Sequence, residues 1–492
     1  MGFEADDAGG CVPVLPPEAC PPGSMAVPGE LACRPVAPCG EATWSEVPVD
    51  ATTQHVDAEF VGLSDGSAAA PWTTVADAVA AAAPGAIVAV AAGSYVEDIV
   101  VEGKAVRIIG RCPAMVELVG GGGLAAVDIR AGATGTELAT LAIRGPTIGV
   151  LLSGSENVVL DRVWIHDNPR RGVDAESALG PTSILLRDSL VEANGRTNVF
   201  VAGAAATIDR AVLRDAYAID ATGARGLAAQ VDTVTGTPSV VHVVGSLIER
   251  NGDGGVGASG SELLIEDSAI RDTQLGETGR RGIGVSIQET SAEGLAAIGT
   301  VRSSVLSGNG TTSLLVSGSV ALLDRVTVVD TVPDVTGDYG RGMGLQSGDT
   351  SLVPSAVTIV DTKVAAGVEV GIFVAGANVD IDGLWVSSTT PDAYGLYGDG
   401  LSITFADGVG TLDVMGSTIV DNVRAGIANF GADVMLGGSA LPCNGFALAG
   451  EPHAGRDHVY DDLGDNRCGC PAEDGGCAVQ STTIGPPNPI EP

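Results

Sequence analysis

Tyrosine and arginine recur together in a series of short polar segments spread along the middle of the chain. These segments read NPRRGVD, AYAIDATGARGL, TQLGETGRRGI, TVPDVTGDYGRGM and TTPDAYGLYGDGL. Tyrosine rings stack on sugar rings, and arginine pairs with carboxylates through two parallel hydrogen bonds. The sequence therefore predicts a surface for an extracellular glycan. Its predicted binding residues are Tyr217, Arg225, Arg281, Tyr339, Arg341, Tyr394 and Tyr397.

The same residues also suit a purely structural role. Each arginine precedes a glycine at the expected start of a strand, where it could pair with an aspartate at the corner of its own coil. A tyrosine could equally brace a long loop. We keep both interpretations of these segments.

Histidine chemistry is a weaker candidate. The run Val163-Trp164-Ile165-His166-Asp167-Asn168 places an imidazole beside a carboxylate, a pair able to move protons. Asp215 and Asp272 occupy the position of Asp167 in later repeats. We therefore interpret Asp167 as a corner residue and His166 as solvated. No GxSxG, HExxH or phosphate-binding loop occurs, and the catalytic residues remain unknown.

A calcium ion is the one cofactor that the sequence makes plausible. Residues 461–466, DDLGDN, gather the hard oxygen ligands that calcium prefers. A solvated acidic turn explains the same residues. No other metal or cofactor is expected.

The cysteines indicate disulfides. No CxxC pair exists, which disfavours zinc, and two groups of cysteines flank the chain. The candidates are Cys20, Cys33, Cys39, Cys112, Cys443, Cys468, Cys470 and Cys477. Disulfides imply an oxidising compartment, so we expect an extracellular or outer-surface location. Residues 1–24 contain no apolar signal-peptide core, and the remaining Cys11 could carry a lipid anchor.

A superrepeat must position all of these residues. Strand-ending glycines at 203, 260, 318 and 376 are 57, 58 and 58 residues apart, and Asp215, Asp272 and Asp330 follow the same period. Each unit holds two similar halves about 22 residues apart, and the rest forms a longer coil with an extra loop. Coils of this length with short strands and Gly, Asn or Asp corners are typical of a β-solenoid. Asparagines at the corner can stack their amides into a ladder.

Composition agrees with this architecture and excludes other classes. Of 492 residues 70 are glycine and only 3% are aromatic, as a narrow core of small aliphatic residues requires. No apolar run reaches the ~18 residues of a membrane span. The net charge of −36 argues against a nucleic-acid partner.

Residues 65–110 carry a family pattern: Asp65-Gly66, a helix over 71–84, Gly85, Gly93-Ser94-Tyr95-Val96-Glu97 and Gly110. This N-terminal segment, with the repeats of 138–440, resembles right-handed parallel β-helix proteins of the pectin-lyase-like superfamily. The resemblance implies an all-β, right-handed parallel β-helix with a short capping helix and Cys-rich termini. We therefore divide the chain into a Pro/Cys-rich segment (1–55), the β-helix (56–440, capped by 71–84) and a Cys-rich C-terminal cap (441–492).

The resemblance says less about activity. Catalytic motifs typical of its polysaccharide-degrading members are missing, since no histidine precedes a glycine and no Arg-x-Lys occurs. We therefore expect a secreted or surface-displayed, monomeric β-helix that acts as a non-enzymatic binding or structural module for an extracellular polysaccharide or surface partner. The alternative is a polysaccharide lyase, glycoside hydrolase or epimerase acting on acidic polysaccharide.

Overall fold

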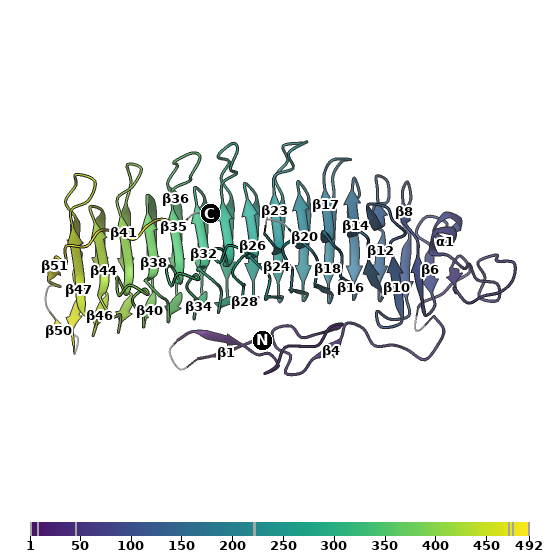
Figure 1. Ribbon diagram of the computed structural model, residues 1–492, viewed down its shortest axis with the longest axis horizontal. Helices are drawn as coiled ribbons and strands as arrows, with labels where there is room; N and C mark the ends of the chain where they lie inside the picture. Colours follow the sequence, from purple (N-terminus) through teal and green to yellow (C-terminus); the bar gives the residue numbers. More distant parts are fainter. Residues whose placement is uncertain are drawn as a thin grey trace. The chain divides into compact units, whose positions relative to one another are not determined.

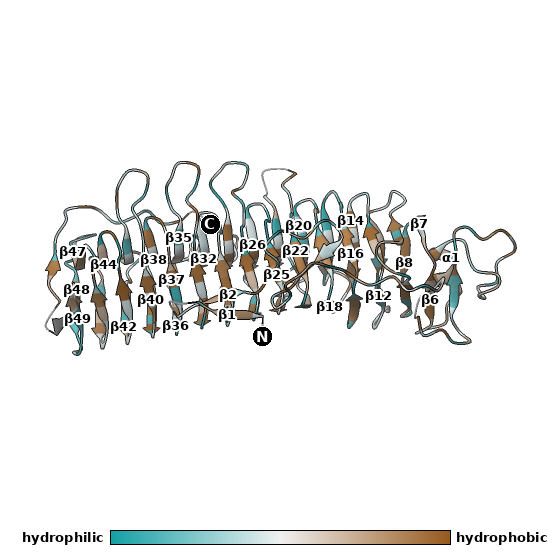
Figure 2. Cartoon of the chain, turned by 90° about the horizontal axis from the view of Figure 1, so that it is seen from below, coloured by the Kyte–Doolittle hydropathy of each residue, from teal (hydrophilic) through white to brown (hydrophobic). Residues whose placement is uncertain are grey.

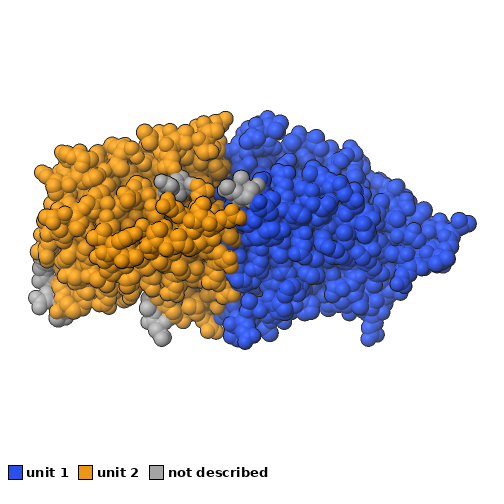
Figure 3. Space-filling view, in the orientation of Figure 1, with its two compact units in different colours: residues 1–2, 14–251 blue, residues 3–13, 252–492 orange. Residues whose placement is uncertain are grey.

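Short strands separated by sharp corners make up nearly all of the chain. Corner residues such as Asp188, Asp215 and Asp272 have φ values of 46°, 56° and 53°, a left-handed conformation that aspartate and glycine tolerate better than most residues. The computed structural model describes residues 2–6, 9–44, 47–219, 223–470, 473–474 and 477–490. It divides into unit 1 (Met1–Gly2 and Val14–Asn251) and unit 2 (Phe3–Pro13 and Gly252–Pro492), coloured separately in Figure 3.

Unit 1 is a parallel β-helix in which the chain visits three sheets in turn (Figure 1). Its first sheet contains β5 (Gln54–Val56), β6 (Ile87–Val90), β9 (Arg107–Gly110), β12 (Glu137–Ala139), β15 (Val158–Asp161), β18 (Ser183–Arg187), β21 (Ala205–Asp209) and β24 (Val240–Val244). Its second sheet contains β7 (Gly93–Val96), β10 (Val116–Val119), β13 (Ala142–Arg144), β16 (Trp164–His166), β19 (Leu190–Glu192), β22 (Val212–Arg214) and β25 (Leu247–Glu249). Its third sheet contains β8 (Ile99–Val101), β11 (Ala125–Ile129), β14 (Ile148–Ser153), β17 (Arg171–Glu176), β20 (Thr197–Ala202) and β23 (Arg225–Gln230).

Unit 2 has the same three-sheet construction. Its first sheet contains β27 (Glu262–Glu266), β30 (Ile298–Arg302), β33 (Val320–Asp324), β36 (Ser355–Val360), β39 (Ala377–Asp382), β42 (Thr411–Met415), β45 (Asp433–Gly437) and β48 (Val459–Asp462). Its second sheet contains β28 (Ala269–Arg271), β31 (Val305–Ser307), β34 (Thr327–Val329), β37 (Lys363–Ala365), β40 (Trp385–Ser387), β43 (Thr418–Val420), β46 (Ala440–Pro442), β49 (Arg467–Gly469) and β50 (Glu473–Asp474). Its third sheet contains β26 (Gly254–Ser259), β29 (Ile283–Gln288), β32 (Thr312–Ser317), β35 (Arg341–Gln346), β38 (Val370–Ala375), β41 (Asp399–Thr404), β44 (Ala425–Phe430), β47 (Phe446–Glu451) and β51 (Val479–Gln480). The coils thus continue past residue 440.

The cores consist of ladders of small aliphatic side chains, and most strands are brown in the hydropathy colouring of Figure 2. The predicted amide ladder is also present. In unit 1 the Nδ2 of Asn168 donates to Oδ1 of Asn194 (2.7 Å), and Asn198 donates to Asn251 (3.0 Å). These bonds satisfy amides that are buried at the corners and, for Asn198, in the adjoining strand β20, where an unpaired polar group would be costly.

Long and short coils alternate as predicted. In unit 2 the second-sheet strands begin at Ala269, Val305, Thr327 and Lys363, which are steps of 36, 22 and 36 residues. The extra residues of each long coil lie in two loops beside the third sheet. We call the loops before the third sheet the Tyr/Arg loops (described residues 215–219 and 223–224 in unit 1; 272–282, 330–340 and 388–398 in unit 2) and those after it the opposite loops (231–239; 289–297, 347–354 and 405–410).

The predicted helix is present but shorter than 71–84. Helix α1 spans Val75–Ala81, with Thr74 as its N-cap, and packs on β5, β6 and β8. The Glu97 carboxylate accepts the backbone N–H groups of Val75 and Ala76, both at 2.8 Å. A negative charge at this helix end is favourable, which explains the glutamate in the Gly-x-Tyr-x-Glu motif.

All eight predicted cysteines form disulfides. The pairs are Cys20–Cys33, Cys39–Cys112, Cys443–Cys470 and Cys468–Cys477. Cys11 is free and exposed. The N-terminal segments add two small antiparallel pairs, β1 (Phe3–Ala5) with β2 (Cys11–Pro13) in unit 2 and β3 (Ser24–Met25) with β4 (Arg34–Pro35) in unit 1.

Candidate functional site

The Tyr/Arg loops of unit 2 lie on one flank and touch one another. The backbone N–H of Val335 donates to the carbonyl of Gly279, and that of Ala393 donates to the carbonyl of Gly337, each at 3.2 Å. These bonds bypass the short coil that separates successive long coils. The loops therefore form a continuous row, as their spacing in the sequence predicted.

Part of the predicted binding set is exposed on these loops. Tyr394 is 67% exposed, and Arg281 is exposed at the end of loop 272–282. In unit 1 Tyr217 is 45% exposed and Arg225 is half-buried. All four residues are therefore at least partly exposed to solvent.

Tyr339 and Arg341 are used inside unit 2 instead. Arg341 is fully buried, and its Nε and Nη2 both bond the carboxylate of Glu369 at 2.9 Å. Its guanidinium lies 4.2 Å from the ring centroid of Phe373 and 5.0 Å from that of Tyr339. This is the bracing arrangement that the sequence left open, but its acid is Glu369 of the next coil and not the Asp330 corner of the same coil.

Tyr397 belongs to a second buried cluster. Asp399 pairs with Arg424, whose guanidinium lies 5.8 Å from the Tyr397 ring centroid. Burial raises the pKa of Asp399 to about 6, and the positive charge of Arg424 limits the rise. Burial likewise raises the pKa of Tyr397.

Residues 481–490 cover the outer face of the third sheet in unit 2, a feature that sequence reasoning missed. The segment runs across the strands (yellow in Figure 1) and not along them. Thr483 N–H donates to Glu451 (2.7 Å), the Tyr397 hydroxyl donates to the Pro486 carbonyl (3.1 Å), and Gln346 pairs with Ile490. No periodic signal marks such a segment, because it belongs to no coil.

The corresponding outer face in unit 1 carries an acidic pair. Arg171 Nη1 lies 2.5 Å from Asp174 and 3.5 Å from Glu176, and its guanidinium stacks 3.5 Å from the Phe200 ring centroid. Asp174 is buried, whereas Glu176 is partly exposed. Burial is the main reason that the pKa of Asp174 rises to about 6; Arg171 opposes the rise, and the Glu176 charge adds to it.

Asp174 should make unfolding of unit 1 depend on pH. The pKa of Asp174 is about 6 in the folded state against an ordinary 3.8, so the folded state binds the carboxyl proton more tightly than the unfolded state does. Protonation of Asp174 therefore stabilises the folded state fully below pH 4, and this stabilisation is lost as pH rises through 6. We expect Asp174→Asn to gain up to about 3 kcal/mol relative to wild type between pH 4 and pH 7. Urea unfolding followed by fluorescence of Trp44, Trp72 and Trp164 measures it, and a variant-to-wild-type difference that is constant with pH would contradict it.

His166 is buried, so the expectation of a solvated imidazole was wrong. Its ring stacks on Trp164 at 3.7 Å between centroids, and Nδ1 lies 2.8 Å from Asp167 Oδ2. Asp167 has a φ of 51° and is the predicted corner residue. Trp164 packs there because the N-terminal segment of unit 1 lies over the second sheet.

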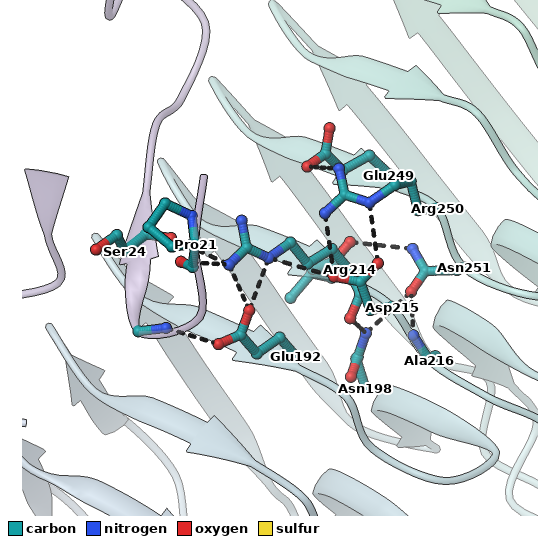
Figure 4. Close-up of polar contacts among 12 residues, drawn as sticks. Pro21, Ser24, Glu192, Asn198, Arg214, Asp215, Ala216, Glu249, Arg250 and Asn251 are labelled. Carbon is teal, nitrogen blue, oxygen red and sulfur yellow. Dashed lines mark hydrogen bonds and ion pairs between the residues drawn. The ribbon is translucent and has the colours of Figure 1, made fainter. Parts of the chain in front are cut away.

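A buried ion pair holds that N-terminal segment (Figure 4). Arg214 is 2% exposed and binds Glu192 through Nε (2.7 Å) and Nη2, while Nη2 also donates to the carbonyls of Pro21 and Ser24 at 3.1 Å. Glu192 in turn accepts the Gly23 N–H (2.9 Å) and the Trp164 indole N–H (2.8 Å). The cluster is an anchor for the segment and leaves no side for a ligand.

The calcium prediction stays a prediction. Asp462 Oδ1 accepts the N–H of Gly464 (2.8 Å) and the Nδ2 of Asn466 (2.7 Å), as a solvated turn would. In the described ranges no three His, Cys, Asp or Glu residues are placed to share a metal.

Comparisons with known proteins found similarity among solved structures alone. No family model and no curated protein matches the chain. Solved structures similar to it include the pectate lyase Pel9A (13% identity, 68% of this chain and 78% of that chain, TM-score 0.40) and a thermostable GH87 alpha-1,3-glucanase from Streptomyces thermodiastaticus (12%, 88% and 70%, 0.43). The periplasmic alginate epimerase AlgG is another (9%, 74% and 77%, 0.40).

The predicted parallel β-helix is confirmed, because each unit winds three sheets around one core. Identities of 9–13% decide nothing about activity. Among the described residues no helix is long and apolar enough to cross a bilayer.

Proposed function

We propose that this chain is an exported, non-enzymatic β-helix that binds an extended extracellular glycan along its Tyr/Arg loops. The observation that supports it most directly is the row formed by loops 272–282, 330–340 and 388–398, in which successive loops are hydrogen-bonded to one another. A rigid row loses little conformational entropy when a long polymer binds. Four disulfides favour export to an oxidising compartment.

Tyr394 and Arg281 are the binding residues of this proposal in unit 2. Both are exposed, so an aromatic ring and a guanidinium can meet sugar rings and carboxylates without rearrangement of the core. Tyr217 and Arg225 offer the same pair of chemical groups in unit 1. We assign bracing, and not glycan contact, to Tyr339, Arg341 and Tyr397.

The enzymatic alternative has less support from the geometry. A hydrolase or lyase needs acid and base groups that reach the substrate. Asp174 and Asp399 are both buried, with side-chain exposures of 2% and 0%, and segment 481–490 covers the Tyr397 cluster. Among the carboxylates of the Asp174 and Asp399 clusters, only that of Glu176 is partly exposed.

We expect glycan binding to depend on the loop residues. Tyr394→Ala combined with Arg281→Ala should weaken binding of an acidic polysaccharide by about tenfold or more, since each lost stacking or ionic contact contributes on the order of 1 kcal/mol. A glycan array of uronic-acid and neutral glycans, followed by titration of the best ligand, measures it. The same incubations are assayed for new reducing ends and unsaturated products.

Leu295→Ala is the control, because Leu295 is also exposed, at 44%, but lies on an opposite loop. Binding lost equally in both variants, or unchanged in the loop variant, would contradict the proposal. Release of products by the wild-type protein would replace it with the enzymatic alternative.

A further inference from the structure

We propose that the outer face of the third sheet in unit 2 is a binding site for an extended, proline-containing peptide, and that residues 481–490 occupy it from within the same chain. This inference is independent of glycan binding, which we place at the loop tips. The site is defined by Gln346, Tyr397 and Glu451, which hold the peptide backbone, and by apolar contacts for two isoleucines.

The backbone of the segment is recognised at three separated points. Gln346 Nε2 donates to the Ile490 carbonyl (2.8 Å) and Oε1 accepts the Ile490 N–H (3.0 Å), so one side-chain amide binds both backbone polar groups of the same residue. The Tyr397 hydroxyl donates to Pro486 (3.1 Å). The Glu451 carboxylate accepts the N–H groups of Thr482 and Thr483. Contacts of this kind accept any extended backbone and fix its direction.

The side chains supply specificity. Ile490 is buried against Ile283, Leu315 and Tyr339. The space that it fills exists because position 344 is glycine: a Cβ there would lie 2.5 Å from Ile490 Cδ1. In the coils on either side the same position holds Leu315 and Phe373.

Ile484 provides a second apolar contact six residues earlier. It packs against the cluster that contains Ala425, Ala428, Phe430 and Ala449. The two isoleucines thus set a spacing that a ligand must match.

Proline suits the backbone between these contacts. A chain that crosses the strands cannot pair its N–H groups with the sheet, and Pro486, Pro487 and Pro489 have no N–H to satisfy. Proline also favours the extended polyproline conformation, which lowers the entropy lost on binding. The ligand class is therefore an extended peptide with two aliphatic side chains six residues apart and prolines between them.

The segment is held as a surface ligand and not as part of a coil. Residues 481, 483, 485, 488 and 489 are exposed, whereas 487 and 490 are buried, so one side faces solvent along its length. An attached segment has an effective concentration in the millimolar range, which hides the site from a free peptide in the wild-type protein.

The experiment compares binding of a labelled peptide, residues 481–490, to two forms of the full chain. Ile484→Asp with Ile490→Asp in the chain should release the covalent segment and open the site. We expect the peptide to bind this variant saturably and at least tenfold more tightly than the wild type. The same peptide carrying Ile490→Asp should bind at least tenfold more weakly.

A second variant tests the site itself. Gly344→Leu fills the space taken by Ile490, so it should speed hydrogen exchange of residues 481–490 in the full chain and abolish peptide binding when added to the opened variant. Circular dichroism verifies folding of each protein.

Three results would overturn the proposal. These are no peptide binding to a folded opened variant, equal binding of the Asp-substituted peptide, and unchanged exchange in Gly344→Leu. An opened face that binds polysaccharide but no peptide would also overturn it. If the double variant does not fold, exchange in Gly344→Leu decides alone.

Discussion

Replacing Glu369 by glutamine should destabilise unit 2 by about 3–5 kcal/mol, the range found when one partner of a buried ion pair is removed. Arg341 is fully buried, and the carboxylate of Glu369 accepts two of its donors at 2.9 Å. Glutamine retains the volume and one acceptor but leaves the guanidinium without a counter-charge. Chemical denaturation followed by fluorescence of Trp385, which lies in unit 2, measures the change.

The paired variant separates lost charge balance from lost packing. Arg341→Met with Glu369→Gln removes the buried cation as well, and a well-packed apolar residue often replaces a buried ion pair at little cost. We expect this double variant to be more stable than Glu369→Gln alone. A double variant that is less stable than the single one would show that the guanidinium contributes mainly through its contacts with Tyr339 and Phe373.

Replacing Glu192 by alanine should release the N-terminal segment of unit 1 and cost a similar 3–5 kcal/mol locally. The carboxylate accepts from Arg214, Gly23 and Trp164 at once, so its loss leaves Arg214 buried without an anion. We expect hydrogen exchange in residues 20–33 to accelerate by at least a hundredfold, which corresponds to about 3 kcal/mol of lost protection. Mass spectrometry of the exchanged protein measures this region directly.

Arg34→Ala is the matched control for the same segment. Arg34 bonds Glu30 at 2.9 Å and lies 3.5 Å from Asp188, but all three side chains are partly exposed. Ion pairs of this kind contribute at most about 1 kcal/mol. Equal acceleration in the two variants would contradict a special role for the buried pair.

The fold could be predicted because its signals are periodic and local. The repeat of 57–58 residues, the glycine and aspartate corners and the small aliphatic residues each report a conformation or a core that neighbouring coils share. The capping helix and its Thr74 cap follow from residues within one turn of each other. The eight paired cysteines followed from composition, although their connectivity did not.

The candidate surfaces were predicted only in part. The spacing of the Tyr/Arg loops placed them on one flank, which the bonds from Val335 and Ala393 to neighbouring loops confirm in unit 2. Spacing could not decide which side chains face outward. Arg281 and Arg341 both precede a glycine, but Arg341 is the first residue of β35 and is fully buried, whereas Arg281 lies two residues before β29 begins at Ile283 and is exposed.

What the sequence determined by itself was the winding: a short-range code of corners and strands that fixes coil length, core composition and the flank from which long loops project. Only the tertiary structure decided the partners of the charged and aromatic side chains. Gln346 meets Ile490 across 144 residues of chain, and Glu192 meets Gly23 across 169. Such contacts depend on how segments outside the repeat lie on its surface, and no local preference of either residue encodes that choice.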